Sequence, residues 1–255
     1  MICIGLICGQ MKTKHYTSYI ARLAGVQGRL KKVYYWGKNP NYPTSNYYYS
    51  FENDSGVTGK IFWNNGVSEA WLNRWFTPTP CNYCDDIFAE CADIAFIDAW
   101  LQEYSKDCQG TSIVVVRSQL AKDLIDRGIK EIILNPISIE KVMQSQEGVV
   151  NIKRQHLAYQ LYFGHQKGLK IPDKRIVPSK LSDPYLQQEI FFKNQMQSVS
   201  REIWDPTKQD AERLLKEMRP YLAQITKMNE GSRIFIFTLK AIQYILRKTR
   251  NFLHE

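Results

Sequence analysis

Closely spaced cysteines are the residues of this chain whose type and spacing best suit metal chemistry. Three of the six cysteines fall within eleven positions, and Cys81 and Cys84 form a C-x-x-C pair directly after a Pro-Thr-Pro segment. Two intervening residues allow both sulfurs to face one ion or cluster. Because zinc and iron–sulfur centres usually need four protein ligands, this pair supplies half of a site.

The remaining cysteines leave three uses open, namely core packing, metal ligation and redox chemistry. Six cysteines in 255 residues are too few for a disulfide scaffold. Cys8 stands beside Gly9 at the end of an apolar run, where the carboxyl edge of an α/β sheet places ligand sites. Cys3 and Cys91 lie on apolar stretches, so we expect them to pack as small hydrophobic side chains.

Other catalytic and cofactor motifs find little support in the sequence. Asp85 and Asp86 follow the C-x-x-C pair, and their negative charge disfavours a nucleophilic dithiol there. Neither a G-x-G-x-x-G segment nor a P-loop occurs, which argues against a Rossmann dinucleotide site and a nucleotide triphosphatase. The four histidines are scattered, so they predict no triad and no zinc partner for the cysteines.

The net charge of +9 is unevenly distributed along the chain. Residues 81–107 carry a net charge of −6, and residues 151–180 carry +6. A basic stretch of this kind suits phosphates, acidic coenzymes or nucleic acid, and the alternative is a solvated helix face with a charged loop.

The hydrophobic pattern predicts the elements that must position these residues. An apolar run over 1–8 and an amphipathic helix begin an α/β unit, and tyrosine-rich segments over 31–63 form an antiparallel hairpin. Residues 92–100 and 111–118 are predicted buried strands, 119–128 a helix and 129–136 a third strand. From about residue 138 onward, the pattern is mostly helical.

These elements predict a mixed α/β (α+β) fold with a central mixed sheet, an antiparallel hairpin excursion and a helical C-terminal region. We place a domain boundary after residue 145, which gives an α/β domain over 1–145 and a basic helical extension over 146–255. The best candidate for a membrane helix, 234–246, is interrupted by Lys240 and Gln243. We therefore expect a cytoplasmic protein without a membrane partner.

Several motifs occur in an order that resembles a known family. They are GLICGQ, CNYCDD, ADIAFIDAW, GTSIVVVRS and SQEGVVNIKRQHL, and they extend over roughly residues 1–165. This order resembles the C-terminal region of the coenzyme F-420 hydrogenase/dehydrogenase beta-subunit family, which includes 7-hydroxymethyl chlorophyll a reductase-like proteins and relatives encoded among polysaccharide-synthesis genes.

The resemblance implies a flavoprotein oxidoreductase component that uses FAD and 4Fe-4S clusters for electron or hydride transfer to an organic coenzyme or substrate. It assigns Cys8, Cys81 and Cys84 as cluster ligands, and the fourth ligand would be Cys91, Cys3 or a residue of a partner chain. Asp98 matches a family aspartate and is the candidate catalytic residue. Candidate flavin-binding residues are Arg117, Ser112 and Gly9.

Three family segments are not found in this sequence. They are a ferredoxin-like four-cysteine motif, a flavin region rich in serine and glycine, and a G-T-P-C-Q loop. We therefore expect activity to depend on another oxidoreductase subunit or on a separately encoded N-terminal half, and we do not expect nucleic acid as a partner. The alternative is a non-catalytic binding or structural module, with a structural zinc or no metal, associated with polysaccharide synthesis or nucleic acid.

Overall fold

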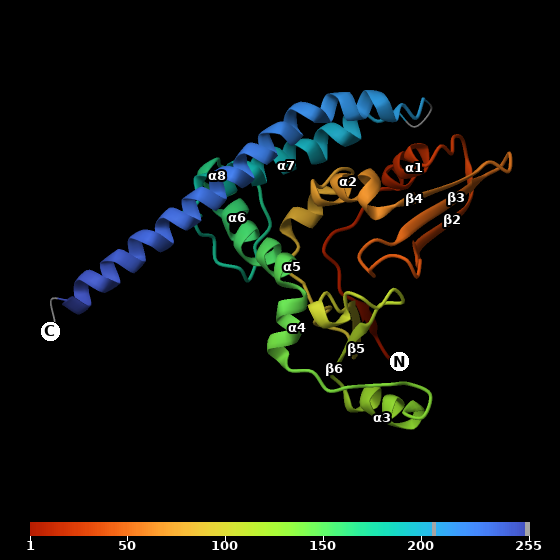
Figure 1. Ribbon diagram of the computed structural model, residues 1–255, viewed down its shortest axis with the longest axis horizontal. Helices are drawn as coiled ribbons and strands as arrows, with labels where there is room; N and C mark the ends of the chain where they lie inside the picture. Colours follow the sequence, from red (N-terminus) through yellow and green to blue (C-terminus); the bar gives the residue numbers. More distant parts are fainter. Residues whose placement is uncertain (206–207, 253–255) are drawn as a thin grey trace.

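The computed structural model describes residues 1–205 and 208–252 (Figure 1). The strands are β1 (Ile4–Leu6), β2 (Leu30–Gly37), β3 (Tyr48–Asn53), β4 (Thr58–Phe62), β5 (Ile94–Asp98) and β6 (Ser112–Val116). The helices are α1 (Lys14–Leu23), α2 (Ser68–Leu72), α3 (Gln119–Gly128), α4 (Ile139–Ser145), α5 (Glu147–Asn151), α6 (Leu157–Gln166), α7 (Pro184–Ile203) and α8 (Ala211–Phe252). Shorter helical turns are η1 (Trp63–Val67), η2 (Thr79–Tyr83), η3 (Gln102–Tyr104) and η4 (Ile152–His156).

A small mixed sheet, in the order β1-β5-β6, carries the N-terminal strand. β1 runs parallel to β5, and β6 runs antiparallel to it. Gly5 lies where a side chain has no room, because an added Cβ would come within 2.4 Å of the Ala89 Cβ. The mixed sheet and the strands expected within 92–100 and 111–118 are confirmed.

The strand predicted over 129–136 is wrong. These residues follow α3 without regular structure, and Ile133 is 95% exposed. A continuous apolar run resembles a buried strand in sequence, but a strand also needs a neighbour with free hydrogen-bonding groups. Among the described residues, this run pairs with neither edge of the sheet.

The second sheet is antiparallel, in the order β2-β3-β4, and confirms the predicted hairpin excursion. Its β3–β4 turn is closed by Asn53, whose side-chain oxygen accepts hydrogen bonds from the Ser55 and Val57 amides at 3.0 and 2.8 Å. Gly56 supplies the left-handed conformation that the turn requires, with φ of 79°.

The main hydrophobic core lies between this second sheet and helices from both ends of the chain. α1 and α2 contribute to it, as do α7 and the first half of α8. Tyr19 packs against Trp75, Phe76 and Trp204 at ring-centroid distances of 5.7 to 5.8 Å. Residues on both sides of position 145 thus share one core, and the boundary placed there stays a prediction.

A smaller core joins the mixed sheet to α4. Ile97 and Ile113, from paired strands, pack with Ala99 and Val142. Figure 1 shows this part below the second sheet, with α4, α5 and α6 leading back toward α7. The predicted mixed α/β fold with a helical C-terminal region is therefore confirmed.

The C-terminal region ends in one long helix. α7 and α8 lie side by side at the top of Figure 1, and α8 then continues well beyond α7. Within the part of the chain described here, no helix combines the length and apolar character needed to cross a membrane.

Candidate functional site

Three cysteines from two distant segments line one cavity of about 110 Å³. Cys8 follows β1, while Cys81 lies in η2 and Cys84 directly after it. Gly9, Asp86 and Lys153 from η4 are among the other residues that line the cavity. The structure thus brings together the three cysteines that the family resemblance assigned to one cluster.

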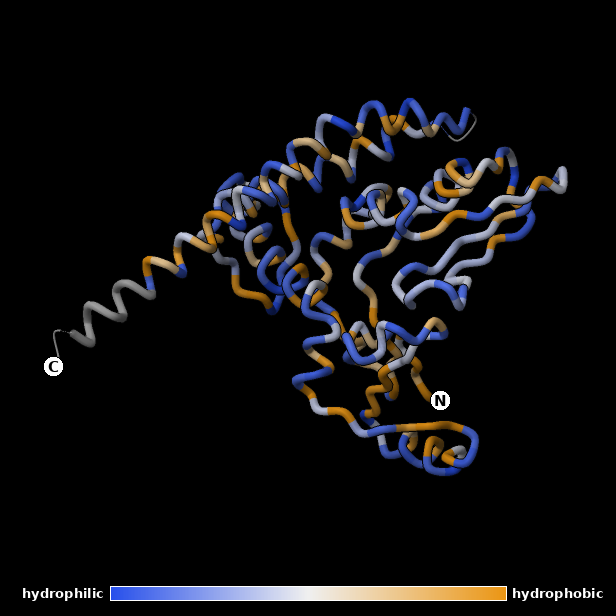
Figure 2. Tube along the Cα trace, viewed as in Figure 1, coloured by the Kyte–Doolittle hydropathy of each residue, from blue (hydrophilic) through white to orange (hydrophobic). Residues whose placement is uncertain are grey.

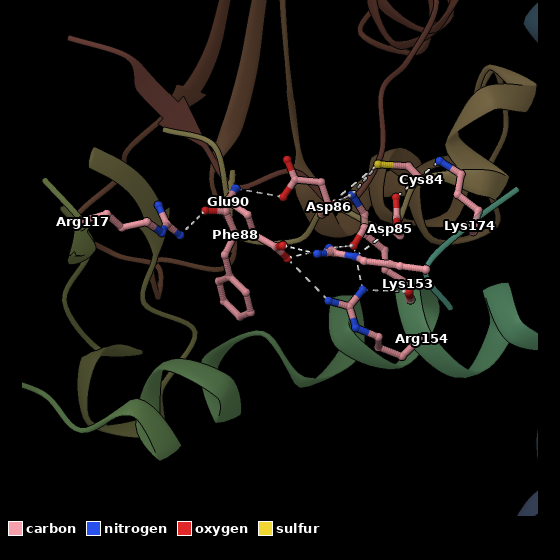
Figure 3. Close-up of polar contacts among 10 residues, drawn as sticks. Cys84, Asp85, Asp86, Phe88, Glu90, Arg117, Lys153, Arg154 and Lys174 are labelled. Carbon is pink, nitrogen blue, oxygen red and sulfur yellow. Dashed lines mark hydrogen bonds and ion pairs between the residues drawn. The ribbon is translucent and has the colours of Figure 1, made fainter. Parts of the chain in front are cut away.

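Backbone and lysine contacts fix the sulfur atoms of the C-x-x-C pair. The Met11 amide donates to Cys81 Sγ at 3.4 Å, and the Cys81 amide donates to the Pro78 carbonyl at 3.0 Å. Lys153 Nζ donates to Cys84 Sγ at 3.3 Å and to the Asp86 carbonyl at 2.6 Å (Figure 3). Hydrogen bonds to sulfur are one of the means by which proteins tune an iron–sulfur centre.

The charges and burial of the cavity change the pKa of Cys8. Burial raises the pKa of the Cys8 thiol, and the nearby Lys153 acts against this rise. Cys81 and Cys84 raise the Cys8 pKa further, because three thiolates cannot ionise together without repulsion. A bound metal centre would relieve this repulsion, because it binds thiolates.

Three enclosed cations surround the cysteines. Lys153 and Arg74 are buried, and Lys12 Nζ lies over the rings of both Tyr16 and Trp71. Lys12 Nζ donates to the Trp75 carbonyl and to Thr77 Oγ1 at 2.9 and 3.0 Å.

None of these cations has a carboxylate partner among the described residues. Arg74 Nη2 donates to Asn82 Oδ1 at 2.8 Å, and Lys153 bonds only to a thiol and a carbonyl. Burial and the Arg74 guanidinium hold the pKa of Lys12 well below its usual range, and Cys81 acts in the opposite direction. Cys81 is a nearby group that can carry compensating negative charge for Lys12 and Arg74.

The spacing of the cysteine side chains bears on the kind of metal centre that they could hold. Over residues 1–205 and 208–252, no three His, Cys, Asp or Glu side chains are placed to hold one metal ion. A cluster spreads its ligands over several iron atoms, so its cysteines lie farther apart than the ligands of one zinc ion. Three cysteines around one cavity, faced by uncompensated cations, are compatible with an anionic cluster.

The other three cysteines, Cys3, Cys91 and Cys108, do not line the cavity, and Cys108 is half-buried. Cys3 and Cys91 are exposed, so the expectation that they pack in the core is wrong. The loop that carries Cys91 turns its side chain to solvent, although its neighbours Ala92 and Ala89 pack near Gly5. Cys91 does not line the cysteine cavity, and its assignment as a fourth ligand stays a prediction.

The oppositely charged stretches of the sequence pair with each other. Arg175 forms ion pairs with Glu90 at 2.5 Å and Asp85 at 3.2 Å, and Lys174 pairs with Asp85 at 3.4 Å. Arg154 Nη1 donates to the Asp85 carbonyl at 2.6 Å (Figure 3). These contacts hold the segment after η2 against η4 and the loop that follows α6, so many of the basic side chains already have partners.

The comparison with protein families supports the resemblance noted in the sequence. Residues 1–141 match the model of a family described as the C terminus of the beta subunit of coenzyme F420 hydrogenase/dehydrogenase. The chain belongs to this family. Membership in this beta-subunit family indicates a redox role, and the match ends before η4, which supplies Lys153.

The other comparisons add little to the family assignment. No curated protein matches the chain. Among solved structures, one chain of the F420-reducing NiFe hydrogenase complex from Methanosarcina barkeri matches at 16% identity and a TM-score of 0.42. The match covers 67% of this chain and 54% of the hydrogenase chain, so this protein spans about half the length of that relative.

Asp98 and Ser112, two site residues expected from the beta-subunit family, lie together at one end of the mixed sheet. They are partners in the β5–β6 register, and neither lines the cysteine cavity. Partial burial raises the pKa of Asp98, and the neighbouring Lys38 opposes this rise. Removal of the carboxyl group from water disfavours its ionised form.

Arg117, the third family position, binds the backbone of the loop before β5. Its guanidinium donates to the Phe88 carbonyl at 2.7 Å (Figure 3). It also donates to the carbonyls of Ala89 and Ala92, at 3.3 Å each. These three bonds use part of the five-donor fork of an arginine. The side chain therefore fixes the loop between the cysteine segment and the sheet.

Sequence reasoning missed Lys12, Arg74 and Lys153 as members of this site. Lys153 falls within the quoted family motif, but its role was not assigned. Lys12 lies four residues after Cys8, and Arg74 seven residues before Cys81. Proximity to cysteines was the available signal, but burial of a charged side chain depends on tertiary contacts.

Proposed function

We propose that this protein is a redox component of an oxidoreductase, in which a 4Fe-4S cluster held by Cys8, Cys81 and Cys84 passes electrons to or from FAD. The acceptor or donor of the hydride is an organic coenzyme or substrate. The observation that carries this proposal is the convergence of three cysteines on one cavity together with three enclosed cations that lack carboxylate partners among the described residues. Family membership supports the redox class.

The charges of the cavity suit this role. Each buried cation without a counter-ion is costly, and an anionic thiolate cluster would offset that cost. When bound, the cluster would supply single-electron transfer. Lys153 would keep its hydrogen bond to Cys84 Sγ, and the Met11 amide would keep its bond to Cys81 Sγ, so both would tune the reduction potential.

The candidate flavin-binding residues lie at three places: in the cysteine cavity, opposite Asp98 in the mixed sheet, and directly after β6. Gly9 lines the cysteine cavity, and Ser112 lies opposite Asp98 in the sheet register. Arg117 retains donors beyond those given to the loop carbonyls, and a flavin phosphate could accept from them. Asp98 would hold the proton that accompanies hydride transfer.

The proposed enzyme also requires a second polypeptide chain. The three cysteines leave one cluster position for another ligand, and the family is described as part of a larger enzyme. We propose that a partner subunit or a separately encoded N-terminal half supplies the missing flavin segments. Cys91 is the alternative source of the fourth thiolate.

Reconstitution of the full chain with iron and sulfide under anaerobic conditions tests the cluster. Broad thiolate-to-iron absorbance and labile sulfide are expected for the wild type and for the matched controls Cys108→Ser and Cys3→Ser. Cys8→Ser, Cys81→Ser and Cys84→Ser are each expected to lose most of the signal. Cys91→Ser decides whether that thiol is a ligand.

Two outcomes would contradict the proposal. One is stoichiometric zinc with no iron uptake, which would indicate a structural metal. The other is a cluster signal that survives in all three cavity variants. Flavin binding is measured separately by quenching of FAD fluorescence with the chain alone and with the candidate partner added, and Arg117→Gln is expected to weaken it.

A further inference from the structure

The last part of α8 separates from the rest of the protein at a defined point. Asp183 caps the N-terminus of α7, accepting from the Tyr185 and Leu186 amides, and it also accepts a hydrogen bond from Ser232. The ring of Tyr185 packs closely over Gly231. Because α7 begins here, α8 has no further helix to pack against beyond Ser232 among the described residues (Figure 1).

Large apolar side chains are exposed directly after this point. They are Ile234, Ile236, Phe237, Leu239 and Ile242, and Phe237 is 75% exposed. Figure 2 shows the same segment as a largely hydrophobic stretch of helix that projects from the body. The proximal half of α8 differs, because Leu214, Met218 and Ile225 are buried in the main core.

The same segment is basic. The sequence from Glu230 to Glu255 contains no acidic residue between these two, while it has five basic residues: Arg233, Lys240, Arg247, Lys248 and Arg250. Of these, Arg233 and Lys240 lie in the described apolar part and are exposed. The segment therefore combines the two kinds of side chain that bind an anionic membrane interface, namely apolar groups and Lys or Arg residues.

We propose that α8, from Arg233 onward, binds the surface of an anionic lipid bilayer and lies along it. The apolar side chains would enter the boundary between headgroups and acyl chains, and the basic side chains would contact anionic headgroups. Lys240 stands in the middle of the apolar residues, and its long stem allows the ammonium group to reach the headgroups while the helix stays in the interface.

Charge complementarity favours a lipid surface over other occupants. A second copy of this segment would bring two basic helices together without acidic residues to offset them, which is unfavourable. Nucleic acid would satisfy the basic residues, but it offers little apolar surface to Phe237 or Ile234. An anionic bilayer satisfies both kinds of side chain.

This inference differs from the expectation of no membrane partner drawn from the sequence. That expectation rested on Lys240 and Gln243, which interrupt a crossing segment. The same residues are compatible with a helix that lies on a bilayer. The surface is also independent of the cysteine cavity, so the redox proposal and this one can fail separately.

Flotation of the full-length chain with vesicles tests the inference. The wild type is expected to float with vesicles that contain phosphatidylglycerol, to bind pure phosphatidylcholine vesicles weakly, and to lose binding in high salt. Phe237→Asp is expected to reduce partitioning by about tenfold or more, because it replaces an inserted ring with a charge. Ile133→Asp, at another exposed apolar position, is the matched control and should leave binding unchanged.

A charge reversal separates the electrostatic contribution. Lys240→Glu should weaken binding to anionic vesicles, whereas Lys216→Glu, in the proximal half of α8, should have a much smaller effect. Circular dichroism confirms that each variant remains folded.

Several results would overturn the inference. No flotation of the folded wild type with anionic vesicles would exclude it. Flotation that Phe237→Asp leaves unchanged would place the lipid contact elsewhere. A dimer by light scattering that Phe237→Asp dissociates, without vesicle binding, would instead assign the segment to a second copy.

Discussion

The main hydrophobic core and the cysteine cavity are held together by different forces. In the core, Tyr19, Trp75 and Trp204 pack ring against ring between helices from both ends of the chain. At the cavity, the buried Lys153 instead donates hydrogen bonds to a carbonyl and a thiol. Apolar burial sets the fold, whereas the position of the cysteines depends on charge.

This difference indicates that the main core provides stability, whereas the cysteine cavity is arranged for function. Buried cations without counter-ions lower stability, and proteins tolerate such groups mainly at functional sites. The apolar core offsets that cost. Mutations in the two regions should therefore have effects of different size, and these effects should depend differently on salt and on pH.

The largest effect is expected in the core. Trp75→Ala should lower the free energy of unfolding by about 3–5 kcal/mol, because it removes a fully buried ring and leaves a cavity. Denaturant titration measures this change. Trp100→Ala, at an exposed tryptophan, is the control, and an equal loss there would show that the core is not the dominant source of stability.

The next effect is a pH dependence from His156 in η4. Burial lowers the pKa of His156 from 6.5 to about 4. Between these values the unfolded chain binds a proton that the folded chain does not, so stability falls as pH decreases from about 7 to about 4, by up to about 3 kcal/mol.

His156→Gln isolates this contribution from that of the carboxylates. The difference in unfolding free energy between the two proteins should change over the same pH interval and stay constant above it. Chemical denaturation at a series of pH values measures it. A constant difference throughout would mean that His156 is solvated in the folded protein.

A smaller effect is expected at Cys8. Lys153→Met removes the cation that opposes the rise in the Cys8 pKa, so the pKa should increase and alkylation at a fixed pH should slow by up to about tenfold. Mass spectrometry of the alkylated peptides measures the rate. Exposed Cys91 provides an internal control in the same sample, and equal slowing of both thiols would contradict the assignment.

The smallest effect is expected for the surface ion pairs. Arg175 is about half exposed, so Arg175→Gln should lower the free energy of unfolding only slightly, and high salt should reduce the difference from the wild type. A loss as large as that of Trp75→Ala would show that these pairs, rather than the core, position the cysteine segment.

Elements with a local pattern could be predicted from the sequence. The β3–β4 turn carries its own chemistry in Asn53 and Gly56, and the β5 and β6 strands have continuous apolar runs. The run at 129–136 has the same appearance but no partner strand among the described residues. Strand pairing is a tertiary property, so periodicity alone could not separate these cases.

The site was only partly predictable for a similar reason. Motif order suggested that Cys8 and Cys81 share a site, although about 70 residues separate them, because a family pattern carries tertiary information that spacing lacks. The opposite charges of 81–107 and 151–180 held a signal for mutual pairing, but the basic stretch was interpreted either as a site for external ligands or as a solvated helix face with a charged loop. The burial of Lys12 could not be inferred from its polar neighbours.

The position of Lys153 has a consequence for how relatives of this protein can diverge. The three cavity cysteines lie within the family-matched residues 1–141, whereas the cation that contacts Cys84 comes from beyond them. Exchanging only the C-terminal helices between relatives would thus alter the electrical environment of the thiols while leaving every cysteine in place. Such a chimera would show how far the redox potential can change between relatives while the cysteine ligands stay the same.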